Sequence, residues 1–167
     1  MLLLLDFVER SASMELLGGC LMSFFMWAVV LQIILLLYFE ITTLVNLYPW
    51  NDLAKYTNKE KMLEATVNGL TILLGIVLFV SGIKWLMIVS VIFWLIFLLM
   101  QLLNWWMPYL TGKHLNQFPR KLYDTHFQET LKILPPIKDH IIPDAQHNVL
   151  QLISLVVFVV SLLALFQ

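Results

Sequence analysis

Four long apolar runs constrain this chain more than any other feature of its sequence. They cover about residues 17–47, 65–83, 85–106 and 147–166. A run of eighteen or more nearly uncharged residues is long enough to cross a bilayer as a helix. Because 60% of the 167 residues are hydrophobic and 13% are charged, little sequence remains for a soluble domain. The sequence predicts an all-α, polytopic integral membrane protein, with residues 1–167 forming a single membrane domain.

Polar and small residues follow a stripe at helical spacing along each run. Polar side chains in a membrane span usually face the bundle interior, because hydrocarbon offers them no hydrogen bonds. We therefore expect an antiparallel four-helix bundle with an inward polar seam and a polar chamber open to the cytoplasm. The stripe residues are Gln32, Glu40, Thr43, Asn68, Thr71, Gly75, Gly82, Ser90, Trp94, Gln101, Asn104, His147, Gln151, Ser154 and Ser161.

The distribution of positive charge predicts the orientation. Four spans place both termini and the short turn at residues 81–84 on one side, and loops 48–62 and 107–146 on the other. These two loops carry eight lysine and arginine residues, whereas the opposite side carries two. Cytoplasmic loops are enriched in positive charge. We therefore expect both loops in the cytoplasm and both termini outside the plasma membrane, with Trp105, Trp106 and Tyr109 in an interfacial aromatic belt.

Several simpler features exclude other classes of protein. The apolar start of the extension at residues 1–16 is too short for a signal-peptide core, and Met14 is an alternative start. A single cysteine, Cys20, excludes an intrachain disulfide and a cysteine metal site. The net charge of −1 gives no support for nucleic-acid binding.

The segment at residues 107–146 is long for a connection and should have its own structure. A helix is predicted from about Pro119 to Ile133, because apolar residues recur there along one stripe. The stripe consists of Tyr123, Phe127, Leu131 and Leu134. We expect this amphipathic cytoplasmic helix to lie on the membrane surface or under the bundle, and Pro135 to end it.

Metal-ligand residue types gather in LPPIKDHIIPDAQH, residues 134–147. Asp139, His140, Asp144 and His147 supply the oxygen and nitrogen ligands that a divalent metal ion needs. His126 and Glu129 add an i, i+3 pair on the predicted loop helix. The alternative is a loop that stops one helix and caps the next, with Asp144 as N-cap of the last span and His147 bonded to it.

Two further carboxylates are candidate catalytic groups. Glu40 lies within the first run, where a buried charge is costly and marks a functional site by default. Its alternative is that the span ends near Tyr38 and Glu40 lies among the headgroups. Asp52 follows an aromatic pair in YPWNDL. It either caps a short helix or reaches the mouth of the polar chamber.

The stretches YPWNDL, LPPIKDH and IPDAQH on a four-span chain resemble small bacterial membrane proteins without an assigned activity. The resemblance runs from Met14 to the C-terminus. It implies a bacterial membrane location and no catalytic residue.

Three functions are compatible with these patterns. The first is a binding, assembly or accessory protein in contact with bilayer lipid and with another membrane or cytoplasmic protein. The second is a membrane-embedded, metal-dependent or acid–base enzyme that acts on a lipid-like substrate at the cytoplasmic interface. The third is a transporter that uses Glu40 as a proton or cation carrier. It is the weakest, because the outer half of the spans lacks a continuing charged path.

Overall fold

The computed structural model describes residues 23–116 and 118–167. Five α-helices and one 3-10 helix make up this part of the chain: α2 (Phe24–Leu44), η1 (Leu53–Lys55), α3 (Asn58–Val80), α4 (Lys84–Thr111), α5 (Arg120–His126) and α6 (Ala145–Ala164). Four of them, α2, α3, α4 and α6, are long and apolar enough to cross a membrane. The all-α prediction with four candidate spans is therefore confirmed. The N-terminal extension, Cys20 and the first residues of the expected first span lie outside the described residues.

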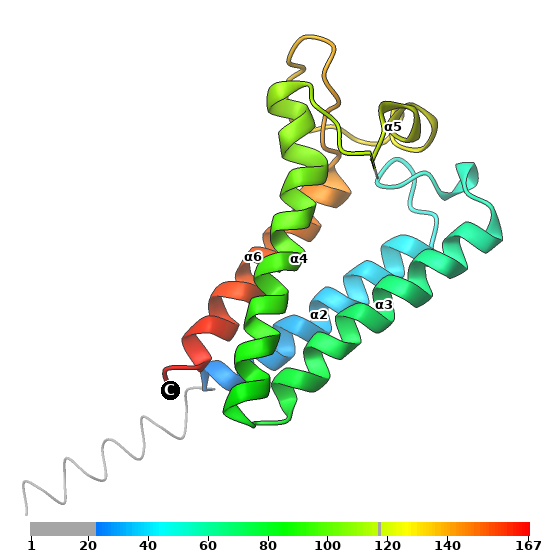
Figure 1. Ribbon diagram of the computed structural model, residues 1–167. Coiled ribbons are helices and arrows are strands. Elements are labelled where there is room, and N and C mark those ends of the chain that lie inside the picture. Colours follow the sequence, from blue (N-terminus) through cyan, green and yellow to red (C-terminus); the bar gives the residue numbers. More distant parts are fainter. Residues whose placement is uncertain (1–22, 117) are drawn as a thin grey trace, which may run out of the picture.

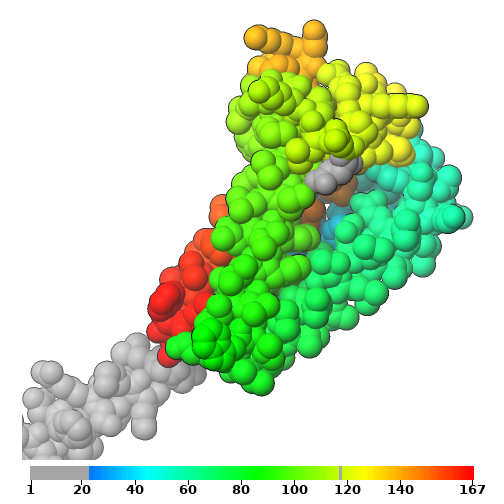
Figure 2. Space-filling model, viewed as in Figure 1, coloured from blue at the N-terminus to red at the C-terminus, as the bar shows by residue number. Residues whose placement is uncertain are grey.

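Each long helix packs against two others: α2 and α4 both contact α3 and α6. The helices gather at the end that carries the α3–α4 turn and spread at the end that carries the long loops (Figure 1). The loop elements α5 and η1 lie over this wider end. The surface is visibly hollowed between α3 and α4 below α5 (Figure 2). The fold thus places the loop residues against the open end of the helices.

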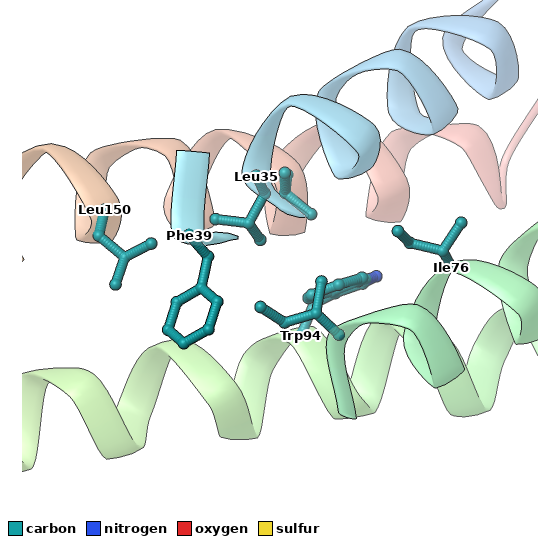
Figure 3. Close-up of a cluster of buried hydrophobic side chains, with 7 residues drawn as sticks. Leu35, Phe39, Ile76, Trp94 and Leu150 are labelled. Atoms are coloured by element: carbon teal, nitrogen blue, oxygen red, sulfur yellow. The ribbon is translucent and has the colours of Figure 1, made fainter. Parts of the chain in front are cut away.

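A cluster around Trp94 forms the centre of the apolar core. All four long helices contribute to it, with Leu35 from α2, Ile76 from α3, Trp94 from α4 and Leu150 from α6. Figure 3 shows the Trp94 ring lying among these side chains. A second cluster lies nearer the α3–α4 turn, around Phe79 and Met87. A third lies beneath the loops, around Trp105 and Tyr123.

Most of the expected polar seam faces inward. Gln32 Nε2 donates to Ser161 Oγ at 2.9 Å, and joins α2 to α6. Gln101 Nε2 donates to Ser154 Oγ at 3.0 Å, and joins α4 to α6. Such bonds stabilise helix contacts where no water can satisfy the amide. The stripe of the second helix is partly wrong, because Thr71 and Gly82 are exposed.

Helix ends differ from the predicted spans where capping groups decide them. The second of the four long helices, α3, begins at Asn58, well before residue 65, because Thr57 and Glu60 form a reciprocal capping box. The third continues to Thr111, and Gly112 ends it with a left-handed φ of 73°. The fourth begins at Ala145, and its N-cap is Asp144, as predicted.

The predicted loop helix at residues 119–133 is too long. It starts after Pro119 as expected but ends at His126. A turn at residues 127–129 follows it. Beyond the turn the backbone bonds to distant parts of the chain: Leu131 N–H donates to the Pro49 carbonyl at 2.7 Å, and the Leu131 carbonyl accepts from Ala145 N–H at 2.8 Å. Leu131 is therefore not on a helical stripe, and its side chain is exposed.

Candidate functional site

A polar pocket lies at the loop end, beneath α5. It is largely enclosed and contains about 20 Å³ of free space, which is room for about one water molecule. Its lining comes from the ends of α2, α3 and α6, from the segment around η1, and from the end of α5. The lining residues are Thr42, Thr43, Asn51, Asp52, Leu53, Tyr56, Glu64, His126, Phe127, Thr130, Gln146 and His147. Three of the predicted site residues, Asp52, His126 and His147, therefore meet in one place.

Asp144 and His147 form the best-defined pair at this pocket. Asp144 is the N-cap of α6, and its Oδ1 accepts from the His147 backbone N–H at 2.8 Å. The same oxygen lies 2.7 Å from Nδ1 of the His147 ring. That ring also packs on Trp105, with centroids 4.1 Å apart. The spacing of one helical turn thus allows a single carboxylate to cap the helix and orient the imidazole.

The Asp144 carboxylate is completely buried and fully engaged. Its Oδ2 accepts from Thr130 Oγ1 at 3.0 Å, and Lys132 Nζ donates to Thr130 Oγ1 at 2.7 Å. Burial tends to raise the pKa of Asp144. The charge and hydrogen bonds of His147 and the Thr130 bond outweigh burial, so that its pKa is lowered. Burial also lowers the pKa of Lys132, an effect that the nearby Asp144 charge opposes. Asp144 therefore remains ionised at neutral pH.

Asp52 and His126 line the other side of the pocket. Asp52 pairs with Lys55 Nζ at 3.6 Å and precedes η1, although its side chain makes no capping bond there. The His126 ring packs against Tyr56, with centroids 4.3 Å apart. Burial, reinforced by the Glu64 charge, raises the pKa of Tyr56. The phenol therefore stays neutral and can only serve this site as a hydrogen-bonding group.

Glu129 does not join His126, contrary to the predicted i, i+3 pair. Because α5 ends at His126, the chain turns away and Glu129 becomes exposed. Its carboxylate lies 3.5 Å from Lys55 Nζ. Lys55 therefore bridges the carboxylates of Asp52 and Glu129, and so links the two loops.

Glu64 is a pocket residue that the sequence patterns did not identify. It lies in the second turn of α3, between Leu63 and Ala65, and faces the same pocket as His126 and His147. Helix-forming residues follow Thr57 in the sequence, but they do not indicate which face of the helix would carry Glu64. The capping box fixes where α3 begins, and the packing of α3 against α2 and α4 decides the direction in which Glu64 points.

Asp139 and His140 lie apart from the pocket. Asp139 is exposed, and its backbone carbonyl accepts from the Arg120 guanidinium. His140 Nδ1 lies 2.7 Å from the Tyr109 carbonyl near the end of α4. The set Asp139, His140, Asp144 and His147 is thus not brought together. Among residues 23–116 and 118–167, no three His, Cys, Asp or Glu side chains are grouped so that they could hold a metal ion.

Glu40 also lies outside the polar pocket, and faces a groove of about 360 Å³ between α2 and α3. Helix α2 continues past it to Leu44. A Cβ on Gly69 would collide with Glu40 Oε1, so the glycine provides the room for the carboxylate. No ion pair of Glu40 forms within the described part of the chain. Glu40 was expected to point into the bundle interior, and this expectation is wrong. At this end of α2 the buried polar side chains are those of Thr42 and Thr43.

The pocket combines the groups needed for proton exchange. When the His147 imidazole is neutral, Nδ1–H donates to Asp144 and Nε2 keeps its lone pair. Nε2 is then the ring nitrogen available to act as a base. Glu64 and His126 provide further proton acceptors at the same pocket.

Comparisons with known protein families, with curated proteins and with solved structures found no match.

Proposed function

We propose that this chain is an integral membrane protein with four antiparallel spans, that it lies in a bacterial plasma membrane, and that it acts as a binding or accessory protein. Loops 48–62 and 107–146 then face the cytoplasm, and both termini lie outside. The four apolar helices and the excess of positive charge on the loops support this arrangement.

A pair of C-terminal fusions tests the orientation. Alkaline phosphatase, which needs an oxidising compartment, should be active when it follows Gln167, and a fluorescent reporter that matures only in the cytoplasm should be dark. The same reporters inserted after Lys113 in the 107–146 loop should give the opposite pattern. A bright cytoplasmic reporter at Gln167 would overturn the orientation.

The polar pocket carries the proposal of a binding function. Residues of both loops and of the ends of α2, α3 and α6 line it. We therefore expect a partner that binds the loops to act on the long helices as well. Its small free volume suits a water-sized ligand, and a larger ligand requires the loops to move. We therefore assign the loops to partner binding and the pocket to the polar chamber that responds to the partner.

Affinity capture from native membranes tests the partner. Lys121 and Gln128 are exposed on the loop, and no ion pair involves either within the described residues, so replacing both by Glu should spare the fold. A membrane or cytoplasmic protein should co-purify with the wild type and be lost from this variant. Lys84→Glu, which changes a charge on the opposite side, is the matched control and should retain the partner. If the loop variant and the wild type capture the same proteins, the accessory function is wrong.

A second candidate is an acid–base enzyme that acts on a lipid-like substrate at the cytoplasmic interface. The observation in its favour is the buried Asp144 that orients His147 toward the pocket. His147→Gln should abolish any change in membrane lipids that the wild type produces when it is overexpressed, whereas His140→Gln should keep it. Lipid profiles of the three strains decide this point, and an unchanged profile in the wild-type strain excludes the candidate.

Elemental analysis of the same preparations tests the metal-dependent form of the enzyme. A divalent metal present in the wild type and lost from the His140→Ala, His147→Ala double variant would favour it. Equal metal content in both would exclude the metal-dependent enzyme, and only the acid–base enzyme would remain as the second candidate.

A further inference from the structure

The outer surface between α4 and α6 carries a groove that the proposed function does not use. Its volume of about 380 Å³ is in the range of small-molecule sites. Its apolar walls are formed by Leu98 and Leu102 of α4, Leu152 and Leu155 of α6, and Ile133 and Leu134 of the loop. None of the residues that line it is charged. The groove therefore suits an apolar chain rather than a charged headgroup.

One buried polar group at this groove lacks a partner. Gln151 lines the groove and is 6% exposed. Its Oε1 accepts from the indole N–H of Trp106 at 2.6 Å. An indole nitrogen can only donate, so this bond determines which end of the amide is oxygen. The other end, Nε2, has no acceptor within the described residues. Nε2 is itself closed to solvent, so the side chain has to turn toward the groove before a ligand can supply the missing acceptor. A buried amide N–H without an acceptor is costly, so a ligand that supplies one would be favoured.

We propose that this groove binds one acyl chain of a membrane glycerolipid, whose ester carbonyl accepts a hydrogen bond from Gln151 Nε2. The acyl chain would lie along the leucine side chains, because the walls of the groove are apolar. The carbonyl lies at the correct depth, because Gln151 is bonded to Trp106, and tryptophans mark the level of the headgroups. This inference rests on the proposed membrane insertion.

Photolabelling tests the site. The full chain is reconstituted in vesicles of phosphatidylethanolamine and phosphatidylglycerol that contain a phosphatidylethanolamine with a diazirine in one acyl chain. Cross-linked peptides are then identified by mass spectrometry. Label should concentrate on the groove segments of α4 and α6. Leu155→Trp fills the groove and should reduce that label more than tenfold. Leu163→Trp is the matched control, since the two leucines are similarly exposed, at 45% and 43%, on the same helix.

A second pair of variants tests the hydrogen bond. Gln151→Leu is made in a Trp106→Phe background, so that no indole N–H is left without its acceptor. Compared with Trp106→Phe alone, the added change should reduce groove labelling about fivefold, the effect of one hydrogen bond. Circular dichroism of every variant establishes that the helices are intact.

Three outcomes would overturn the lipid site. Even labelling of all outer helix faces, unaffected by Leu155→Trp, means contact with bulk bilayer lipid only. Displacement of the label by a short-chain quinone, but not by unlabelled phospholipid, means a quinone site. A cross-link to a co-purified protein at the groove means a partner helix. Release of the protein from membranes by carbonate washing would instead overturn the proposed membrane insertion, and so distinguishes the two failures.

Discussion

Two aspartate–histidine pairs lie within residues 134–147, and the structure treats them differently. Asp144 and His147 are joined by their side chains, and Asp144 is completely buried. Asp139 and His140 are neighbours in sequence, but Asp139 is exposed and His140 binds a backbone carbonyl of α4 instead. The difference arises because a spacing of three on a helix brings side chains together, whereas adjacent residues in a turn diverge. Residue type alone therefore did not distinguish the site from the loop.

Removal of the buried carboxylate should give the largest effect. Asp144→Ala deletes the N-cap of α6 and removes the acceptor of the His147 N–H. It also removes one of the two acceptors of Thr130 Oγ1, which keeps the Phe127 carbonyl. We expect a loss of about 3 kcal/mol in the free energy of unfolding. Asp139→Ala should leave stability unchanged. Denaturant unfolding in mild detergent, followed by tryptophan fluorescence, measures both. If both variants lose the same free energy of unfolding, the two aspartate–histidine pairs do not differ in structural importance.

A substitution at Gly112 tests how His140, of the pair Asp139 and His140, packs against the end of α4. Gly112 has a φ of 73°, and an added Cβ would approach His140 Nε2 to 2.9 Å. Gly112→Ala should cost about 2 kcal/mol, from left-handed strain together with displacement of the ring. Gly82 has a φ of 68°, and no atom lies within 4 Å of an added Cβ, so Gly82→Ala isolates the strain. A larger loss of thermal stability at Gly82 than at Gly112 would contradict the proposed packing of His140.

The pH dependence of the stability should show how much the negative charge of Asp144 stabilises the folded protein. Its pKa is lowered in the folded protein, so its stabilising effect is present above the unfolded value of about 3.9. The effect is lost as the pH falls through the lower folded pKa. The difference in thermal stability between wild type and Asp144→Asn should thus narrow as the pH falls below about 4. A difference that stays the same below pH 4 would show that the carboxylate is not stabilised by its partners.

The smallest expected effect is a gain. Lys138, in the turn closed by the His140 N–H to Ile137 carbonyl bond of 3.0 Å, has a φ of 50°. A left-handed conformation strains any residue with a Cβ, and glycine adopts it freely. Lys138→Gly should therefore stabilise the protein by about 0.5 kcal/mol, after the entropic cost of glycine is subtracted. Lys121→Gly, on the exposed face of α5, should instead destabilise it. A loss of stability at position 138 would contradict the observed turn.

Much of the fold could be predicted because it depends on local patterns. The four apolar runs predicted the four long helices, and Asp144 after Pro143 predicted the cap of the last one. The loop helix was predicted too long, because the apolar stripe through Leu131 continues in the sequence. Its backbone, however, bonds to Pro49 and Ala145. Such bonds join segments far apart in the chain, and periodicity contains no information about them.

The candidate site was predictable only in part, for a related reason. Asp52, His126 and His147 could be selected by residue type, and they do meet at one pocket. Glu64 was missed, since a carboxylate in the first turns of a helix is more often a solvated charge. Glu40 was expected to face inward, but it points into the groove opposite Gly69. The rotation of each helix about its axis depends on its neighbours.

The sequence by itself determined the all-α class and the four helices that are long and apolar enough to cross a membrane, since apolar runs and helix caps depend on residues near one another. The tertiary structure decided which polar groups meet. It brought Glu64, His126 and His147 to one pocket, separated Asp139 from Asp144, and left Gln151 Nε2 without an acceptor among the described residues. These outcomes depend on how helices rotate and where loops bond across the chain. Both are set by packing and long-range hydrogen bonds rather than by local preference.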